Sequence, residues 1–192
     1  MKLFFSFLLL LCCTLTAHAQ LEQGTWLVGG SGSYYNYTAL NSGPNYSTDS
    51  KYTNISLTPY IGIFILDKFA VGVLPTFSSV KGKVTSTGGM STNVQRYRIG
   101  PFARYYILNA ANPFNIVTAI SYQYGVFGGI ATGNLTTFSA LAGPVIYFNS
   151  VVGLEMLLGY NYSKEMQTDV GGINAITKGF QISVGFQIHL KK

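Results

Sequence analysis

Alternation of apolar and polar side chains is the dominant pattern of the chain, and it is clearest in residues 94–107. Side chains at every second position of a strand share a face. One face of this segment carries Arg96, Arg98, Gly100, Phe102, Arg104 and Tyr106, and the other carries Tyr97, Ile99, Pro101, Ala103, Tyr105 and Ile107. Every arginine of the chain therefore lies opposite an uncharged face. A membrane barrel turns its apolar face to lipid and its polar face inward, the reverse of a soluble sheet.

Similar alternation recurs in eight segments rich in Val, Ile, Tyr, Phe and Thr, and no long helical periodicity or apolar run of membrane-helix length follows residue 20. The segments are 25–37, 52–66, 69–84, 93–108, 114–127, 135–148, 151–163 and 176–190. Their lengths suit tilted strands that cross a bilayer. The sequence therefore predicts an all-β fold, an eight-stranded antiparallel up-and-down transmembrane β-barrel.

The connections between these segments alternate in predicted length. Residues 66–68, 109–113 and 149–150 are short, whereas 38–51, 85–92, 128–134 and 164–175 are mostly longer and rich in Ser, Thr, Asn and Gly. Short turns on one side and long loops on the other are typical of outer-membrane barrels. We expect the short turns and both termini to be periplasmic and the four loops to lie outside the cell.

Three prolines recur one hairpin apart, in the similar stretches around Pro59, Pro101 and Pro144. Proline cannot donate a hydrogen bond to a neighbouring strand. We therefore expect a β-bulge at each of the three sites.

The first 19 residues have the organisation of a secretory signal peptide. Lys2 precedes an apolar run at 3–15, and Ala17-His18-Ala19 is a small-residue cleavage site. Residues 20–192 would then form the mature barrel domain. Cys12 and Cys13 lie within the signal, so the mature domain has no thiol for disulfides or catalysis.

The low charge of the chain agrees with a membrane location. Charged residues make up 9% of the sequence, against roughly 25% in an average soluble domain. The net charge of +6 suggests nucleic-acid binding at first, but the lysines are scattered and the arginines share one strand face. We therefore expect no nucleic-acid partner. A secreted soluble barrel of the lipocalin type is the alternative fold, and the apolar outward faces argue against it.

The faces of the predicted strands separate a lipid side from a lumen. Representative lipid-facing residues are Leu57, Ile61, Val71, Ile99, Ile120, Leu154 and Val184. The lumen of an eight-stranded barrel is just wide enough to be filled by side chains. Arg96, Arg98, Arg104 and Glu155 point into it as a polar network. Arg104 and Glu155 each lie four residues from a periplasmic strand end, so we expect a bidentate pair, with Arg98 sharing the carboxylate or bonding to Gln and Tyr.

Several short motifs resemble one known family. They are Gly24-Thr25-Trp26-Leu27-Val28-Gly29-Gly30, Thr58-Pro59-Tyr60-Ile61-Gly62, Leu66-Asp67-Lys68-Phe69-Ala70-Val71-Gly72, Gly100-Pro101-Phe102-Ala103-Arg104-Tyr105-Tyr106 and Gly179-Phe180. Over the whole mature chain they resemble small outer-membrane β-barrel proteins of the porin-like β-barrel domain family. The resemblance implies the fold and the cell outer membrane rather than an activity. The chain departs from many such barrels by ending in His189-Leu190-Lys191-Lys192 instead of an aromatic residue read by the barrel assembly machinery.

The residues offer little support for catalysis, a metal or a cofactor. Barrel enzymes need histidine with Ser, Asp or Glu at the outer rim, whereas His189 is expected at the periplasmic rim. Scattered carboxylates make no metal-ligand set. Lysines near the outer rim, such as Lys81 and Lys178, suit lipopolysaccharide phosphates.

The sequence therefore predicts a monomeric, non-enzymatic outer-membrane protein whose loops carry a structural or surface-interaction role. Its lumen would be closed by the Arg/Glu network. The alternative is a narrow porin or carrier for small, anionic solutes, in which the same arginines form a cationic constriction.

Overall fold

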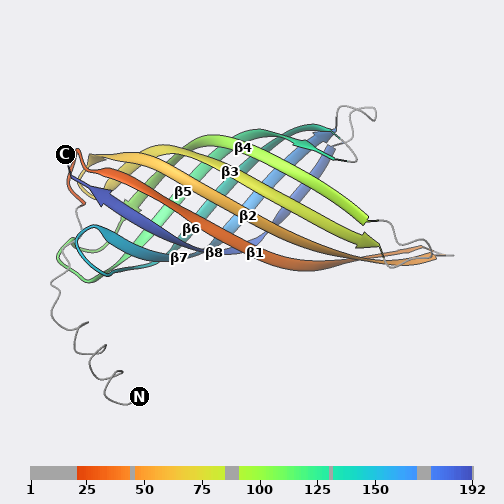
Figure 1. The fold of residues 1–192 in the computed structure, drawn as a ribbon, viewed down its shortest axis with the longest axis horizontal. Helices are drawn as coiled ribbons and strands as arrows, with labels where there is room; N and C mark the ends of the chain where they lie inside the picture. Colours follow the sequence, from red (N-terminus) through yellow and green to blue (C-terminus); the bar gives the residue numbers. More distant parts are fainter. Residues whose placement is uncertain (1–20, 44–45, 85–90, 130–131, 168–173, 192) are drawn as a thin grey trace, which may run out of the picture.

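The computed structural model describes residues 21–43, 46–84, 91–129, 132–167 and 174–191. Over these residues the chain forms one closed barrel in which each strand pairs antiparallel with the next and β1 pairs with β8 (Figure 1). The all-β, eight-stranded antiparallel barrel predicted from the alternation is confirmed. The predicted signal peptide, 1–19, lies outside the described residues.

The eight strands follow each other around the barrel in chain order, as Figure 1 shows. Their bounds are β1 Trp26–Gly43, β2 Tyr46–Leu66, β3 Phe69–Val84, β4 Ser91–Tyr106, β5 Phe114–Gly128, β6 Gly133–Tyr147, β7 Val152–Gln167 and β8 Asn174–Leu190. No helix in the described part of the chain is long and apolar enough to cross a membrane.

The predicted alternation of short turns and long loops is wrong. The residues between strands are 44–45, 85–90, 129–132 and 168–173 at one end, and 67–68, 107–113 and 148–151 at the other. The expected loop 38–51 is instead mostly strand, with pairing from Thr38↔Lys51 to Gly43↔Tyr46. Polar Ser, Thr and Asn continue an antiparallel ladder as well as apolar residues do, because the ladder is made by backbone groups.

The expected bulges at the three prolines are also wrong. Pro59 pairs with Gly30, Pro101 with Val73 and Pro144 with Ile116, all in unbroken register. On the other side of each proline the ladder has a short gap, after which the same register resumes. Each proline therefore lies where the pairing with one neighbouring strand is interrupted, so its missing N–H leaves no ladder bond unmade. No extra residue is inserted, as a β-bulge would require. Among the described strand pairs, the register shifts once, between Phe64 and Leu66.

Glycine beside the proline permits the close approach of strands at two of these gaps. A Cβ at Gly100 would collide with the backbone oxygen of Tyr122, and one at Gly143 with that of Met156. Only a residue without a side chain fits between strands this close.

Burial alternates along the strands as predicted, with one face inside the barrel and the other on its outer wall. β5 shows the pattern through Phe114–Gly128, where every second residue is buried up to Ala119 and again from Gln123. Apolar residues on the outer wall are Leu57, Ile61, Ile99, Ile120 and Val184, between 46% and 59% exposed, and the half-buried Val71 and Leu154.

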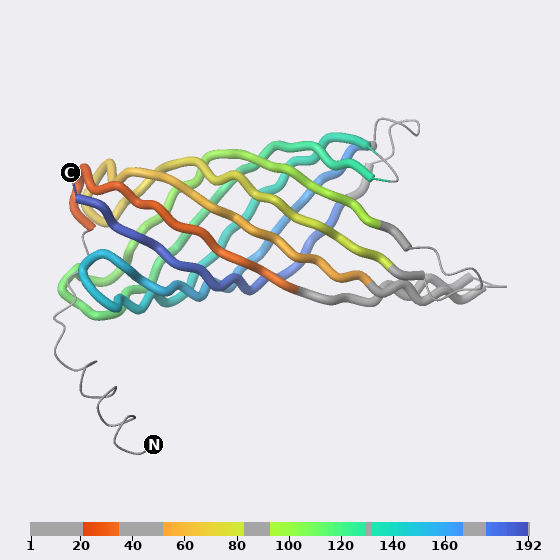
Figure 2. The backbone as a smooth tube through the Cα atoms, in the orientation of Figure 1, coloured from red at the N-terminus to blue at the C-terminus, as the bar shows by residue number. Residues whose placement is uncertain are grey.

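The chain ahead of β1 closes against the turn between β2 and β3. Gln23 N donates to Asp67 Oδ1 at 2.9 Å and Lys68 N donates to the carbonyl of Leu21 at 2.8 Å. Lys191, after β8, forms an exposed ion pair with Glu22 at 2.8 Å. The side chain of Leu21 is consequently buried with the core residues of the barrel. Both ends of the described chain lie at the end of the barrel that holds the 67–68 turn (Figure 2).

Candidate functional site

A buried ion pair crosses the lumen between β4 and β7. Arg104 Nη1 lies 2.7 Å from Glu155 Oε2, and Nη2 lies 3.3 Å from Oε1, so the contact has the bidentate form. The exposed fractions of the two side chains are 6% and 0%. The two residues are far apart in sequence, and the closure of the sheet brings them together.

Aromatic rings surround the guanidinium group of Arg104. Its central carbon lies 4.0 Å from the ring centroid of Tyr60 and 5.5 Å from that of Phe102. Nη1 also donates to the hydroxyl of Tyr60 at 3.1 Å. Ring faces and a hydroxyl thus supply the cation with contacts that water would otherwise provide. Such a buried pair depends on this full set of partners, because desolvation of each charge is costly.

On the side of the ion pair nearer the chain termini, the lumen is filled by a cluster that we call the plug, formed by Leu21, Leu27, Phe64, Tyr106, Tyr147, Gln187 and His189. All seven side chains are at most 5% exposed. Tyr106 donates its hydroxyl to Gln187 Oε1 at 2.7 Å, and Gln187 Nε2 donates to the Tyr147 hydroxyl at 3.3 Å. The apolar members and their rings pack into one core.

The prediction that His189 is a rim residue is wrong. Its side chain is 0% exposed and its ring centroid lies 5.6 Å from Phe64, 6.0 Å from Tyr106 and 5.7 Å from Tyr147. The parity of β8 explains this, because Gln187 and His189 share the inward face. The alternation could have placed it inside, but its closeness to the terminus suggested a rim position.

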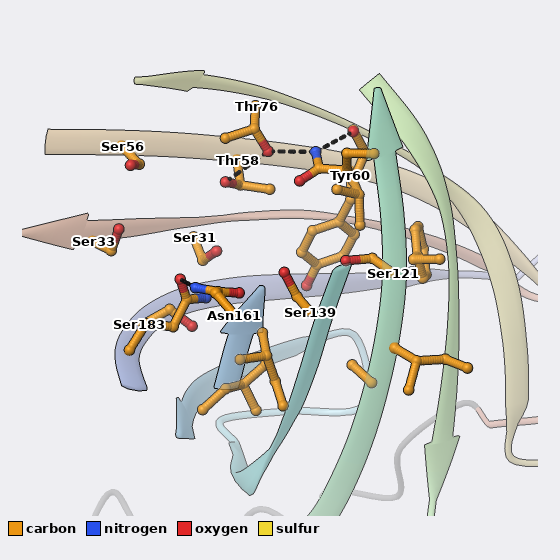
Figure 3. A pocket seen from close by; sticks show the side chains of 18 of the residues that line it. Ser31, Ser33, Ser56, Thr58, Tyr60, Thr76, Ser121, Ser139, Asn161 and Ser183 are labelled. Atoms are coloured by element: carbon orange, nitrogen blue, oxygen red, sulfur yellow. Dashed lines mark hydrogen bonds between the residues drawn. The ribbon is translucent and has the colours of Figure 1, made fainter. Parts of the chain in front are cut away.

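On the other side of the ion pair, the lumen is polar and holds a small cavity of about 80 Å³. Figure 3 shows its lining, in which the hydroxyls of Ser31, Ser121, Ser139 and Ser183 come from four different strands. Gln123 Nε2 donates to Thr76 Oγ1 at 2.8 Å and Thr76 Oγ1 donates to Thr58 Oγ1 at 3.1 Å. Asn161 of β7 donates to Gln181 on the neighbouring strand β8.

A larger cavity, of about 530 Å³, lies toward the 85–90 and 168–173 connections, and we call it the outer cavity. It holds the other two arginines. Arg96 Nε donates to Glu165 Oε1 at 2.9 Å and Arg98 Nη1 donates to Thr137 Oγ1 at 3.1 Å. Lys178 also lines it.

The four residues expected to form one network are therefore placed at two levels. The structure brings Arg104 together with Glu155, while Arg96 pairs with Glu165 and Arg98 bonds to a threonine. Glu165 was missed because the sequence placed it in a loop, whereas β7 continues to Gln167. An alternation followed further along residues 152–167 would have put Glu165 on the same face as Glu155.

Comparison with solved structures finds the same architecture in outer-membrane proteins. The chain aligns with OprG of Pseudomonas aeruginosa at a TM-score of 0.54 and 12% identity, over 93% of this chain and 100% of that one. It has the fold of a small outer-membrane β-barrel. Neisserial surface protein A (NspA) aligns at a TM-score of 0.48 and 14% identity, over 86% of this chain and 96% of that one. No protein-family model matches the chain, and no curated protein matches it significantly.

Proposed function

We propose that this protein is a non-conducting barrel of the cell outer membrane that acts by binding at its outer end. The observation that carries the proposal is the filling of the lumen around Arg104, Glu155 and the plug. Side chains there are 0–6% exposed, and they are held by two charge-assisted bonds and a Tyr–Gln–Tyr chain. A solute could pass only if this packed set moved apart.

The outer wall supports the membrane placement. Large apolar side chains such as Leu57, Ile99, Ile120 and Phe186 are each more than half exposed, and they encircle the barrel. Soluble monomers rarely expose a continuous apolar surface of this extent. The described charged residues of this wall, Lys81, Lys164 and Lys178, occur on the outer ends of their strands. The signal-peptide pattern of residues 1–19 supports export.

Partners follow from this placement. Lys81, Lys164 and Lys178 would contact phosphate groups of lipopolysaccharide, which offers anionic charge at that level. The barrel assembly machinery would insert a membrane barrel of this kind. We expect a monomer without enzymatic activity. The tips of the outer connections, at 44–45, 85–90, 130–131 and 168–173, lie outside the described residues.

Single-channel recording of the purified, folded barrel in a planar bilayer tests the proposal. We expect no conductance steps. A double variant, Tyr106→Ala with Tyr147→Ala, is the control, because it removes two rings of the plug. Steps from the variant and silence from the parent would attribute the silence to the plug rather than to failed insertion. Steady steps from the parent would overturn the proposal.

A narrow porin for small anions is the second candidate, and the outer cavity with Arg96 and Arg98 is the observation that favours it. This candidate predicts anion-selective steps from the parent protein that are lost in Arg98→Ala. It also requires that Glu155, which blocks the route beyond the cavity, swing away from Arg104.

A further inference from the structure

The seam between β1 and β8 closes only part of the barrel wall. Pairing runs from Trp26↔Leu190 to Gly32↔Val184, whereas β1 continues to Gly43 and β8 begins at Asn174. On its other side β8 pairs with β7 along nearly its whole length, to Met166↔Asn174. In Figure 2 the β8 tube turns away from β1 where their pairing ends. Within the described strands, the first part of β8 is therefore a sheet edge at the seam.

The outer cavity reaches this edge. Its lining includes Ser33, the first residue of β1 beyond the paired seam, and five successive residues of β8, Thr177 to Gln181. Successive strand residues point to opposite faces, so a cavity lined by five in a row extends around the strand edge. The exposure of the β8 residues supports this reading. Residues 176–180 are all exposed, whereas from Gln181 onward the inward residues are less exposed than the outward ones. The cavity thus opens sideways through the wall.

The two sides of this opening differ in chemistry. Inside, Arg96 and Arg98 accompany one carboxylate, Glu165, which leaves a net positive charge. Lys178 lines the cavity from the strand edge, and its Nζ lies over the outward-facing ring of Tyr162, 5.6 Å from the ring centroid. Polar Ser, Thr, Asn and Gln side chains make up much of the remaining lining, together with the apolar Val80, Leu135 and Phe180.

Outside, the wall beside the opening is apolar. The exposed fractions are 84% for Phe180, 61% for Ile182 and 64% for Tyr34 on the β1 side. Phe180 stacks edge-on with Tyr160 at 5.8 Å between centroids. A ligand that matches both sides has an anionic head and an apolar chain.

We propose that the β1–β8 opening binds an anionic amphiphile of the surrounding membrane, a phosphorylated lipid whose head enters the outer cavity and whose chains lie along Phe180 and Ile182. Phosphate oxygens would accept hydrogen bonds from Arg98 inside the cavity and from Lys178 at the outer side of the strand edge, since guanidinium and ammonium groups both suit phosphate. The site rests on the proposed membrane placement, but it does not depend on whether the lumen conducts.

Native mass spectrometry of the full folded barrel, released from zwitterionic detergent, tests the head-group preference. Phosphatidylglycerol, phosphatidylcholine of the same chain length and inorganic phosphate are titrated separately. We expect retention of phosphatidylglycerol, and weakening by about tenfold in Arg98→Gln, the effect of losing one charge-assisted hydrogen bond. Lys191→Gln makes the same charge change at the opposite end of the barrel and should leave retention unchanged. Equal retention of both lipids would overturn the proposal.

Two glycines allow a test of the lateral entrance. A Cβ at Gly179 or at Gly128 meets nothing within 4 Å, so both positions accept a larger residue without collision. Gly179 lines the outer cavity, whereas Gly128 lies at the end of β5 and lines neither cavity. We expect Gly179→Trp to abolish phosphatidylglycerol retention and Gly128→Trp to preserve it. Equal retention in both variants would show that the opening is not the site.

A disulfide across the seam provides an independent test. The register of the paired part, continued by one residue, places Ser33 opposite Ser183. Oxidised Ser33→Cys/Ser183→Cys should lose lipid retention and regain it on reduction, in a mature domain predicted to have no other cysteine. If inorganic phosphate binds as tightly as the lipid and is insensitive to the disulfide, the cavity is a free-anion site and the proposal fails. A conducting barrel that still retains the lipid would overturn the non-conducting function alone.

Discussion

Replacing Glu155 by Gln removes one charge from the lumen and little else. The amide keeps the size of the side chain and one oxygen that can accept from Arg104. What changes is that the guanidinium, 6% exposed, loses its counter-ion at 2.7 Å. Breaking a buried pair by removing one partner costs about 3–5 kcal/mol. Because the Tyr60 hydroxyl and ring still contact Arg104, we expect about 3 kcal/mol, the lower end of that range.

Urea unfolding of the barrel in phospholipid vesicles measures this loss, with the fluorescence of Trp26, the single tryptophan, as the probe. Two matched variants calibrate the result. Glu165→Gln breaks the ion pair with Arg96, in which the side chain of Arg96 is 20% exposed and that of Glu165 is 17% exposed. It should cost about 1 kcal/mol or less. Glu22→Gln breaks an exposed pair and should have no measurable effect.

The order Glu155, Glu165, Glu22 is the decisive outcome, because it follows the burial of the three carboxylates. A free energy of unfolding for Glu155→Gln within about 0.5 kcal/mol of the parent, the range of ordinary surface substitutions, would refute the reasoning. A double variant, Arg104→Met with Glu155→Leu, completes the argument. It should be more stable than Glu155→Gln alone, since no unpaired charge remains in the lumen.

The remaining predictions concern backbone fit and the plug. Gly100→Ala should reduce the folded fraction, read from the gel-mobility change on boiling, because its Cβ meets the Tyr122 backbone oxygen, whereas Gly128→Ala should fold normally. His189→Ala should cost about 2–4 kcal/mol in urea unfolding, as for other large-to-small core changes, and a rim residue would cost far less. Tyr106→Phe should cost about 1 kcal/mol for the bond to Gln187, and no loss would indicate that water replaces the hydroxyl.

Local alternation determined much of this fold. Successive side chains of a strand point to opposite faces, so the order of residues alone determines which of them share a face. This was enough to assign the inward face of residues 96–106 and the outward face of residues 97–107. The turn at 67–68 lies between two strongly alternating strands, and it was predicted at its observed place. The same parity, followed without assumptions about loops, would also have placed Glu165 and His189 inside.

Only the tertiary structure decided which inward residues meet. Arg96 and Arg104 share one face, yet they pair with Glu165 and Glu155 because the register of all eight strands sets the depth of each residue in the lumen. Strand ends and the unbroken register at Pro59 likewise depend on backbone pairing with a neighbour, which side-chain patterns do not specify. The opening between β1 and β8 is the clearest case, because closure joins the two strands farthest apart in the sequence.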